Sequence, residues 1–196
     1  GDGYSKDGSY YYTSIIYGQR ETDAVSFRAT AYKVDKGTSH FRHSDVHDEE
    51  SIKVLKRIVK KLSSAGIDVV TFLSPLSPTV YANMKRSENN YMYIEHFRKE
   101  LYGIASYHFD LHDPSKINTS DCEYIDGYHG GEVVSARIIK AMMSSTGAKF
   151  NSIVDDIVVN NLIKTYEGLA GGLNDGNFIK YNNREVDFLD LGCDKT

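Results

Sequence analysis

Residues 65–75 read AGIDVVTFLSP, in which a glycine is followed by a nearly continuous apolar run that ends at Ser-Pro. A short run of this kind is typical of a strand that is buried on both faces of a parallel sheet. The preceding residues, 44–65, place apolar side chains at helical spacing after an acidic first turn. We expect this helix to have its N-cap at Ser44 or Asp45 and to end at Gly66. Helix, glycine and buried strand in this order indicate an α/β fold.

The same order of elements returns downstream. A helix is expected over about residues 88–102, and a second buried strand in ASYHFDLHD, residues 105–113. A polar loop then leads to a helix over residues 131–145, and residues 150–172 form another amphipathic helix. Alternating helices and short apolar strands predict a three-layer α/β sandwich with a mainly parallel sheet, in a single domain over residues 1–196.

Three parts of this domain are distinguished by pattern. Residues 1–35 alternate polar residues with aromatic or β-branched ones, which predicts a β-rich arm. Residues 45–146 contain the alternating helices and strands. Residues 150–196 add an extra helix and a polar tail, with a short strand expected at NFIKY.

Composition excludes some classes of function. The chain has 23 basic and 27 acidic residues and no basic stripe, so nucleic-acid binding is not expected. No apolar run approaches the roughly 18 residues of a membrane span, and no signal segment is recognised at the start. Two cysteines, Cys122 and Cys193, leave the redox compartment and their pairing open. Fifteen tyrosines without a tryptophan fit either compositional drift or a surface on which sugars stack.

Residues 122–133 read CEYIDGYHGGEV and place Asp126 three residues before His129, in a loop after a predicted parallel strand. Ligand sites of open α/β sheets lie at the carboxyl ends of strands. In a turn containing Gly127, the carboxylate can accept a hydrogen bond from the ring Nδ1–H, which leaves Nε2 to take a proton from a serine. The alternative is that Asp126 only caps a turn and that His129 is a solvated residue at a helix start.

Together with these elements, Asp126-Gly-Tyr-His129 resembles the last catalytic block of SGNH (GDSL-like) hydrolases, which is Asp-x-x-His before the final helix. The nearest branch is that of bacterial envelope polysaccharide and teichoic-acid acyl-transfer proteins. FLSPLSP at residues 72–78 is similar to a strand end of that branch, and KDGSYYY at residues 6–12 is similar to its Asp-Gly-Ser segment. The resemblance covers about residues 5–146 and corresponds to the C-terminal half of such a domain.

The resemblance implies a serine esterase or O-acyltransferase that acts on acylated glycans of the bacterial cell envelope. His129 would be the general base and Asp126 would orient its ring. It further implies no cofactor, a location in the cell envelope or outside the cell, an acylated polysaccharide or other ester as substrate, and a membrane-associated acyl-transfer partner. Ser74 and His112, at the ends of the predicted strands, and Tyr128, beside the histidine, are candidate substrate-binding residues. A turn role for Ser74 and core packing for His112 are the alternatives.

The nucleophilic serine and the oxyanion-hole residues of that superfamily belong to blocks that precede the matched segments, and none of these blocks is recognised here. GDGYS at residues 1–5 has no hydrophobic strand before it, and Gly3 stands where the serine would be, so Ser5 is not expected to be the nucleophile. The expected fold is therefore SGNH- or flavodoxin-like with its N-terminal part missing. Three interpretations stay open: a C-terminal segment of a longer enzyme, a serine recruited from elsewhere in the chain, or a non-catalytic binding or assembly module of the cell envelope.

A second cluster of polar residues lies in SHFRHSDVHDEES. Its three histidines and two carboxylates, the ligand types that zinc prefers, are His40, His43, Asp45, His47 and Asp48. Their spacing matches no standard structural zinc site. A loop that leads into an acid-rich helix start explains the same residues, so no metal is expected.

Overall fold

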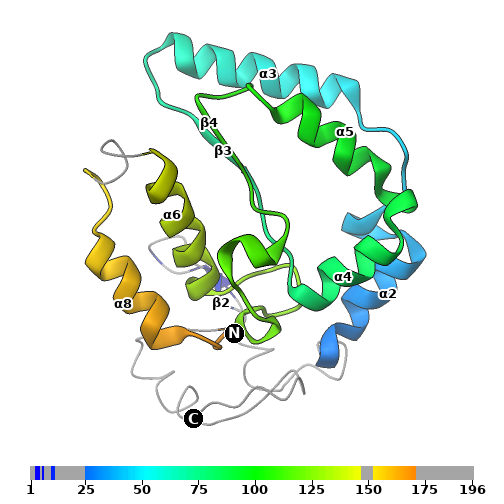
Figure 1. Cartoon of the computed structure of the whole chain (residues 1–196). Coiled ribbons are helices and arrows are strands. Elements are labelled where there is room, and N and C mark those ends of the chain that lie inside the picture. The colour runs from blue at the N-terminus through cyan, green and yellow to red at the C-terminus, as the bar shows by residue number, and fades with distance from the viewer. Residues whose placement is uncertain (1–2, 5, 7–9, 12–24, 147–151, 171–196) are drawn as a thin grey trace.

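The computed structural model describes residues 3–4, 6, 10–11, 25–146 and 152–170, which form a mixed α/β fold (Figure 1). Two strands lie at its centre, β3 (Val70–Leu73) and β4 (Tyr107–Asp110). They pair in parallel, with Val70 opposite Tyr107 and Leu73 opposite Asp110. Both strands lie where the sequence predicts them, and their parallel pairing is confirmed.

Helices make up most of the described residues. Figure 1 shows α5 on one side of the two strands and α6 on the other, with α8 beside α6 and α2 beside α4. The α-helices are α2 (Arg28–Lys36), α3 (Glu49–Ser64), α4 (Pro78–Arg86), α5 (Met92–Leu101), α6 (Glu132–Thr146) and α8 (Asp156–Tyr166). Single 3₁₀ turns are η1 (Val25–Phe27), η2 (Ser39–Phe41), η3 (Glu88–Tyr91), η4 (Pro114–Ile117) and η5 (Asp121–Glu123).

The prediction of a β-rich arm over residues 1–35 is wrong for its second half. Residues 28–36 are helix α2, because the side chains buried there, Thr30 and Val34, are one helical turn apart and face α4. The apolar residues of AVSFRATAYKV can line one face of a helix as well as one face of a strand. The alanine and basic residues of this segment have a higher propensity for the helix. In the first half, β1 (Gly3–Tyr4) and β2 (Tyr10–Tyr11) pair antiparallel.

Helix α3 begins three or four residues later than predicted. Its N-cap is Asp48, whose carboxylate accepts hydrogen bonds from the backbone N–H groups of Glu50 and Ser51. Ser44, one of the two predicted caps, instead bonds to Val46 within a turn. A carboxylate directly before the helix caps it better than a serine further upstream, because the first free N–H groups lie within its reach.

The expectation that the first strand is buried on both faces is also wrong for the part of the chain that the structure describes. Phe72 in β3 is 45% exposed. On α3, only Ile52 and Val59 of the apolar face are buried, while Val54 and Ile58 are exposed. Val70, Thr71 and Leu73 are half-buried, so the described residues cover neither face of β3 completely, and Phe72 is the most open position.

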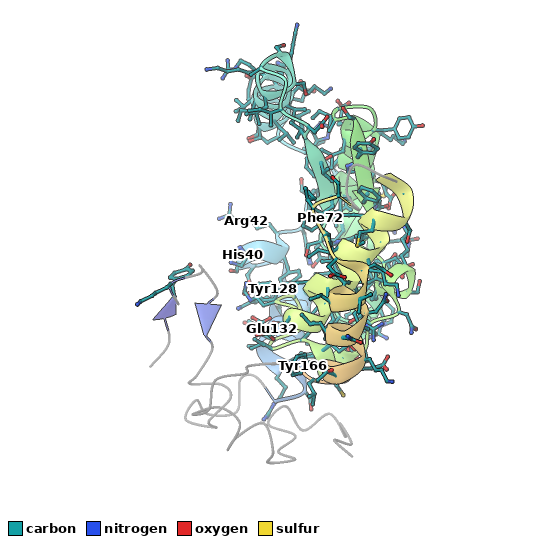
Figure 2. The ribbon with its side chains drawn as sticks, turned by 90° about the vertical axis from the view of Figure 1, so that its left-hand side faces the viewer. His40, Arg42, Phe72, Tyr128, Glu132 and Tyr166 are labelled. Carbon is teal, nitrogen blue, oxygen red and sulfur yellow. The ribbon has the colours of Figure 1, made fainter. Side chains whose placement is uncertain are left out.

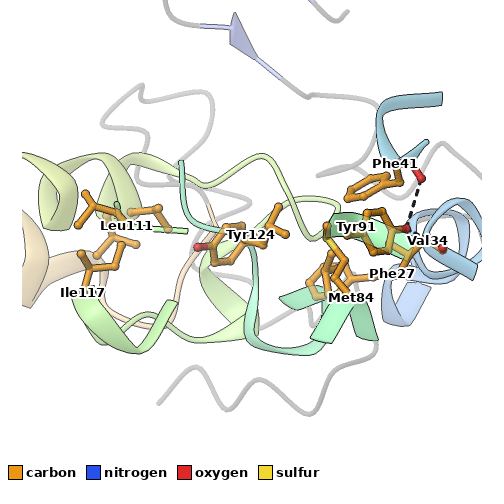
Figure 3. Packing of buried hydrophobic residues seen from close by; sticks show 12 residues of the cluster. Phe27, Val34, Phe41, Met84, Tyr91, Leu111, Ile117 and Tyr124 are labelled. Atoms are coloured by element: carbon orange, nitrogen blue, oxygen red, sulfur yellow. Dashed lines mark hydrogen bonds between the residues drawn. The ribbon is translucent and has the colours of Figure 1, made fainter. Parts of the chain in front are cut away.

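A further helix that the sequence pattern did not indicate, α4, begins at the last proline of the FLSPLSP segment. Ser77 caps it by accepting the backbone N–H of Val80, and Pro78 occupies the first turn, where its missing N–H costs nothing. The core runs from Val34 and Phe27 near α2, past Tyr124, to Leu111 and Ile117 (Figure 3). The helix over residues 88–102 is α5 preceded by η3.

Cys122 is disulfide-bonded. Cys193 and the strand predicted at NFIKY lie outside the described residues. None of the helices in the described ranges is long and apolar enough to cross a membrane.

Candidate active site

A tight loop between η5 and α6 holds Asp126 and His129. Its two sides are joined by backbone hydrogen bonds, from Gly131 N to Glu123 O at 2.9 Å and from Ile125 N to His129 O at 2.9 Å. Asp126 Oδ1 accepts the backbone N–H of His129 at 2.9 Å, and Asp126 Oδ2 lies 2.7 Å from His129 Nδ1. One carboxylate therefore fixes both the turn and the ring.

The contact between Asp126 and His129 determines which ring nitrogen carries the proton. An ionised carboxylate only accepts hydrogen bonds, so Nδ1 is the protonated nitrogen and the lone pair of the neutral ring lies on Nε2. The His129 side chain is 43% exposed and that of Asp126 is 21% exposed, so solutes can reach the ring. The two interpretations of Asp126, turn cap and ring partner, hold at the same time.

Gly127 allows the turn to lie against α4. Its φ is +92°, and a Cβ at this position would be 2.6 Å from Cγ2 of Val80. The carbonyl of Gly127 accepts a hydrogen bond from the backbone N–H of Ser77 at 2.9 Å. The turn is thereby attached to the segment that follows β3, which brings it to the carboxyl end of the sheet.

Glu123 anchors the loop from beneath and was not predicted. Its side chain is 1% exposed, and Oε1 lies 3.0 Å from Arg137 Nη2 on α6 and 3.1 Å from the backbone N of Gly168 after α8. The hydroxyl of Thr119 donates to Oε2. The only sequence signal is the Ser-x-x-Glu spacing before a short helix, which by itself indicates a capping box rather than a buried anchor.

An aromatic wall adjoins the histidine and consists of Tyr128, Phe41 and His40. The ring centroid of Tyr128 lies 4.1 Å from that of His129, 5.6 Å from Phe41 and 5.9 Å from His40. Figure 2 shows His40 and Tyr128 next to each other on one side of the molecule, below Phe72. Residues from η2 and from the η5–α6 loop meet here, and nothing in their spacing along the sequence predicts it.

One cavity lies next to this wall, and a second cavity shares part of the first cavity's lining. The apolar cavity, of about 330 Å³, is lined by the three predicted substrate-binding residues, Ser74, His112 and Tyr128, together with side chains such as Phe41 and Phe97. None of its lining residues carries a formal charge. Because Tyr128 contacts the His129 ring, this cavity adjoins the Asp126–His129 pair.

The charged cavity, of about 350 Å³, lies between α4 and α5. Its charged lining residues are Lys85, Glu88, Glu95 and Arg98, and it shares the side chains of Met84, Ile94 and His112 with the apolar cavity. His112 therefore belongs to the wall of both cavities. The sequence suggested His112 as a site residue from its place at the end of the strand but gave no indication of the charged cavity.

The ring of His112 is oriented by a backbone carbonyl. His112 Nδ1 lies 3.0 Å from Ser74 O, and because a carbonyl only accepts, Nδ1 carries the proton. Burial lowers the pKa of His112, so the ring is neutral at pH 7. Its Nε2 is a buried acceptor, and nothing among the described residues donates a hydrogen bond to it.

The histidines of residues 40–47 are dispersed rather than clustered. His40 belongs to the aromatic wall, His43 packs edge-on against Tyr91, and His47 faces His96. Across the described ranges, no three His, Cys, Asp or Glu side chains are grouped so that they could hold a metal ion.

Comparisons with protein-family models, with curated proteins and with solved structures give no match for this chain. The functional argument therefore rests on the geometry of the Asp126–His129 pair and of the two cavities.

Proposed function

We propose that the chain is a segment of an SGNH-like serine esterase or O-acyltransferase that acts on acylated glycans of the cell envelope. One observation carries the proposal: Asp126 Oδ2 lies 2.7 Å from His129 Nδ1, in a loop between a parallel strand and the next helix. The pair thus has the tautomer and the partial exposure that a general base needs.

The proposal includes the finer architecture of a three-layer sandwich. Parallel sheets in α/β proteins are covered by helices on both faces. The parallel pairing of β3 with β4 supports an α/β sheet, and the partly exposed Phe72 supports a further layer that covers this face of the sheet.

The chemistry that follows is acyl transfer. A serine Oγ, which we do not assign among the described residues, attacks the ester carbonyl while its proton passes to Nε2 of His129. Asp126 stabilises the imidazolium, which then protonates the leaving alkoxide as the C–O bond breaks. Water or an acceptor hydroxyl next attacks the acyl-enzyme, with the same nitrogen first taking and then returning a proton.

The test uses the full-length protein and a fluorophosphonate probe, which phosphonylates only activated serines. We expect one serine to be labelled, and we expect His129→Ala to lower the labelling rate by about 10²-fold or more. Asp126→Ala should lower it as well, because the ring loses its orientation. His47→Ala, a change of a histidine outside the site, is the matched control and should leave the rate unchanged.

A non-catalytic binding or assembly module is the second candidate. Ile153, Ile157 and Val158, at and before the start of α8, are 76%, 71% and 59% exposed, as expected for a surface that meets a partner. A labelling rate that is equal in His129→Ala and in the wild type, or a complete lack of labelled serine, would remove the catalytic proposal in favour of this one.

A further inference from the structure

The apolar cavity can be reached from solvent. Two of the residues that line it, His40 and Ser74, are exposed, and Figure 2 shows His40 on one side of the molecule beside Tyr128. Further lining side chains are half-buried, namely Leu73, Tyr93, Ile94, Phe97 and Tyr128. A ligand contacts such side chains without first opening the core. An open hollow that is lined mainly by apolar side chains is the usual form of a small-molecule site.

The lining restricts the ligand to an uncharged, apolar group. Among the described residues that line the cavity, none is Asp, Glu, Lys or Arg. A charged group in the cavity would lose its hydration without meeting an opposite charge, and a sugar ring would bury several hydroxyl groups that each need a partner. An aliphatic chain has no polar atom to satisfy, and each methylene group that leaves water contributes favourably.

The size of the cavity sets the length of the chain. Its volume is about 330 Å³, and a group of the size of a water molecule occupies about 30 Å³, so roughly ten such groups fit. An octanoyl group together with both carboxyl oxygens has this number of non-hydrogen atoms. An acetyl group would leave most of the apolar lining in contact with water, so it gains little from the cavity.

The cavity adjoins the proposed general base through Tyr128. The ring of Tyr128 lines the cavity, and its centroid lies 4.1 Å from that of the His129 ring. Attack on an ester requires that the ester carbonyl lie beside the general base, with the acyl chain on one side and the alcohol on the other. The alcohol of a glycan ester carries further hydroxyl groups, which would lose their water in an apolar cavity. The acyl chain is therefore the half of the ester that suits the cavity.

We propose that the apolar cavity binds a straight acyl chain of about eight carbon atoms, whose carbonyl end lies toward Tyr128 and His129. The binding of the chain rests on the cavity alone, whereas its role as the acyl half of an ester rests on the proposed function. The acylated glycan of that proposal would then carry a medium-length acyl group rather than an acetyl group.

Two measurements on the full-length protein test this. Nuclear magnetic resonance titrations with acetate, butanoate, octanoate and benzoate measure binding without any catalysis. Hydrolysis of the para-nitrophenyl esters of acetate, butanoate, octanoate and dodecanoate gives kcat/KM against chain length.

Three variants report on the cavity. Leu73→Trp fills it and Phe97→Ala enlarges it, and both residues line the apolar cavity but not the charged one. Met92→Trp is the matched control, because Met92 is 38% exposed and lines only the charged cavity.

We expect the Kd to fall about threefold for each methylene group added between acetate and octanoate, and benzoate to bind more weakly than octanoate. The value of kcat/KM should be highest for the octanoate ester. Leu73→Trp should raise the Kd of octanoate about tenfold or more and move the highest kcat/KM to the butanoate ester. Phe97→Ala should move it toward the dodecanoate ester, and Met92→Trp should behave like the wild type. If Leu73→Trp does not fold, the shift in Phe97→Ala still decides.

Several outcomes would overturn the inference. Octanoate that binds no more tightly than acetate would remove the site, and tighter binding of benzoate would mean that an aromatic group occupies it. Octanoate binding that is the same in Phe97→Ala, in folded Leu73→Trp and in the wild type would place the chain elsewhere. Ester hydrolysis that does not depend on chain length, despite tight binding of octanoate, would remove the acyl role.

The two proposals can fail separately. Chain-length-dependent binding in the cavity, without serine labelling that depends on His129, would keep this site and remove only the catalytic proposal. Labelling that depends on His129, without chain-length-dependent binding, would keep the catalytic proposal and remove only this site.

Discussion

Replacement of Glu123 by alanine tests whether the buried anchor holds the η5–α6 loop. The substitution leaves the guanidinium of Arg137, whose side chain is 10% exposed, without its buried partner. Removal of one member of a buried ion pair costs about 3–5 kcal/mol. The backbone N–H of Gly168 and the hydroxyl of Thr119 lose their acceptor at the same time.

The second partner of Arg137 does not replace the first. Glu167 lies 2.8 Å from Arg137, but its side chain is 63% exposed, and an exposed pair contributes only about 0–1 kcal/mol. We therefore expect Glu123→Ala to lower the free energy of unfolding by about 3–4 kcal/mol. Small domains have a total of about 5–15 kcal/mol, so a large part of the stability would be lost.

Urea unfolding, followed by far-ultraviolet circular dichroism, measures this loss. Glu167→Ala is the matched control, because it removes the exposed partner of the same guanidinium and should cost less than about 1 kcal/mol. The double variant Glu123→Leu with Arg137→Met removes both buried charges, and it should be more stable than the sum of the two single effects predicts.

Two results would refute this reasoning. One is a cost below about 1 kcal/mol for Glu123→Ala, which would mean that solvent reaches the pair. The other is a double variant whose loss equals the sum of the single losses, because two residues that share a buried contact must show coupling.

Two further predictions concern the turn and the core. Gly127→Ala should lower the free energy of unfolding in urea by about 3 kcal/mol, because φ is +92° and the new Cβ would lie 2.6 Å from Val80. Gly103→Ala is the control and should lower it by about 1 kcal/mol, because φ is +76° there but the space around the new Cβ is open. Burial raises the pKa of Tyr91 to about 12, from about 10 in the unfolded chain. Between these pH values the folded state keeps a proton that the unfolded chain releases. The free energy of unfolding should therefore fall as the pH rises from about 10 to 12. Tyr91→Phe, which removes the hydrogen bond to Val34, should cost about 1 kcal/mol at neutral pH and make this alkaline loss less steep in unfolding experiments at several pH values.

The parts of the fold that depend on local pattern could be predicted from the sequence. The apolar runs of β3 and β4, the helical period of α5 and α6, and the Asp-x-x-His spacing are all properties of neighbouring residues. Helix α2 was missed, because its apolar residues fit a strand face as well as a helical face, and only its residue propensities and its contact with α4 favour the helix. Helix α4 was not predicted, because the prolines of FLSPLSP indicate the end of a strand, although Pro78 also stands in the first turn of the helix that follows.

The parts of the site that depend on contacts between distant residues could not be predicted. Glu123 and Gly168 are 45 residues apart, and their contact depends on how α8 packs on α6. The charged cavity forms only because α4 and α5 lie beside the end of β4, where His112 follows the strand. The periodicity of apolar residues does not indicate which distant residues come into contact, because such contacts depend on how whole helices and strands pack.

The contacts that define the Asp126–His129 pair, by contrast, join residues that are close to each other in the sequence. Within the described part of the chain, the hydrogen bonds between Asp126 and His129 and those that join the two sides of the turn link residues between 123 and 131, while Ser77 holds the carbonyl of Gly127 from outside this segment. Contacts that span so few residues need little loop-closure entropy, so they can form early in folding and before any helix docks. The geometry of the pair is therefore set mainly within residues 123–131, whereas the place of this turn in the fold is set by contacts from outside it, such as those of Glu123 with Arg137 and Gly168.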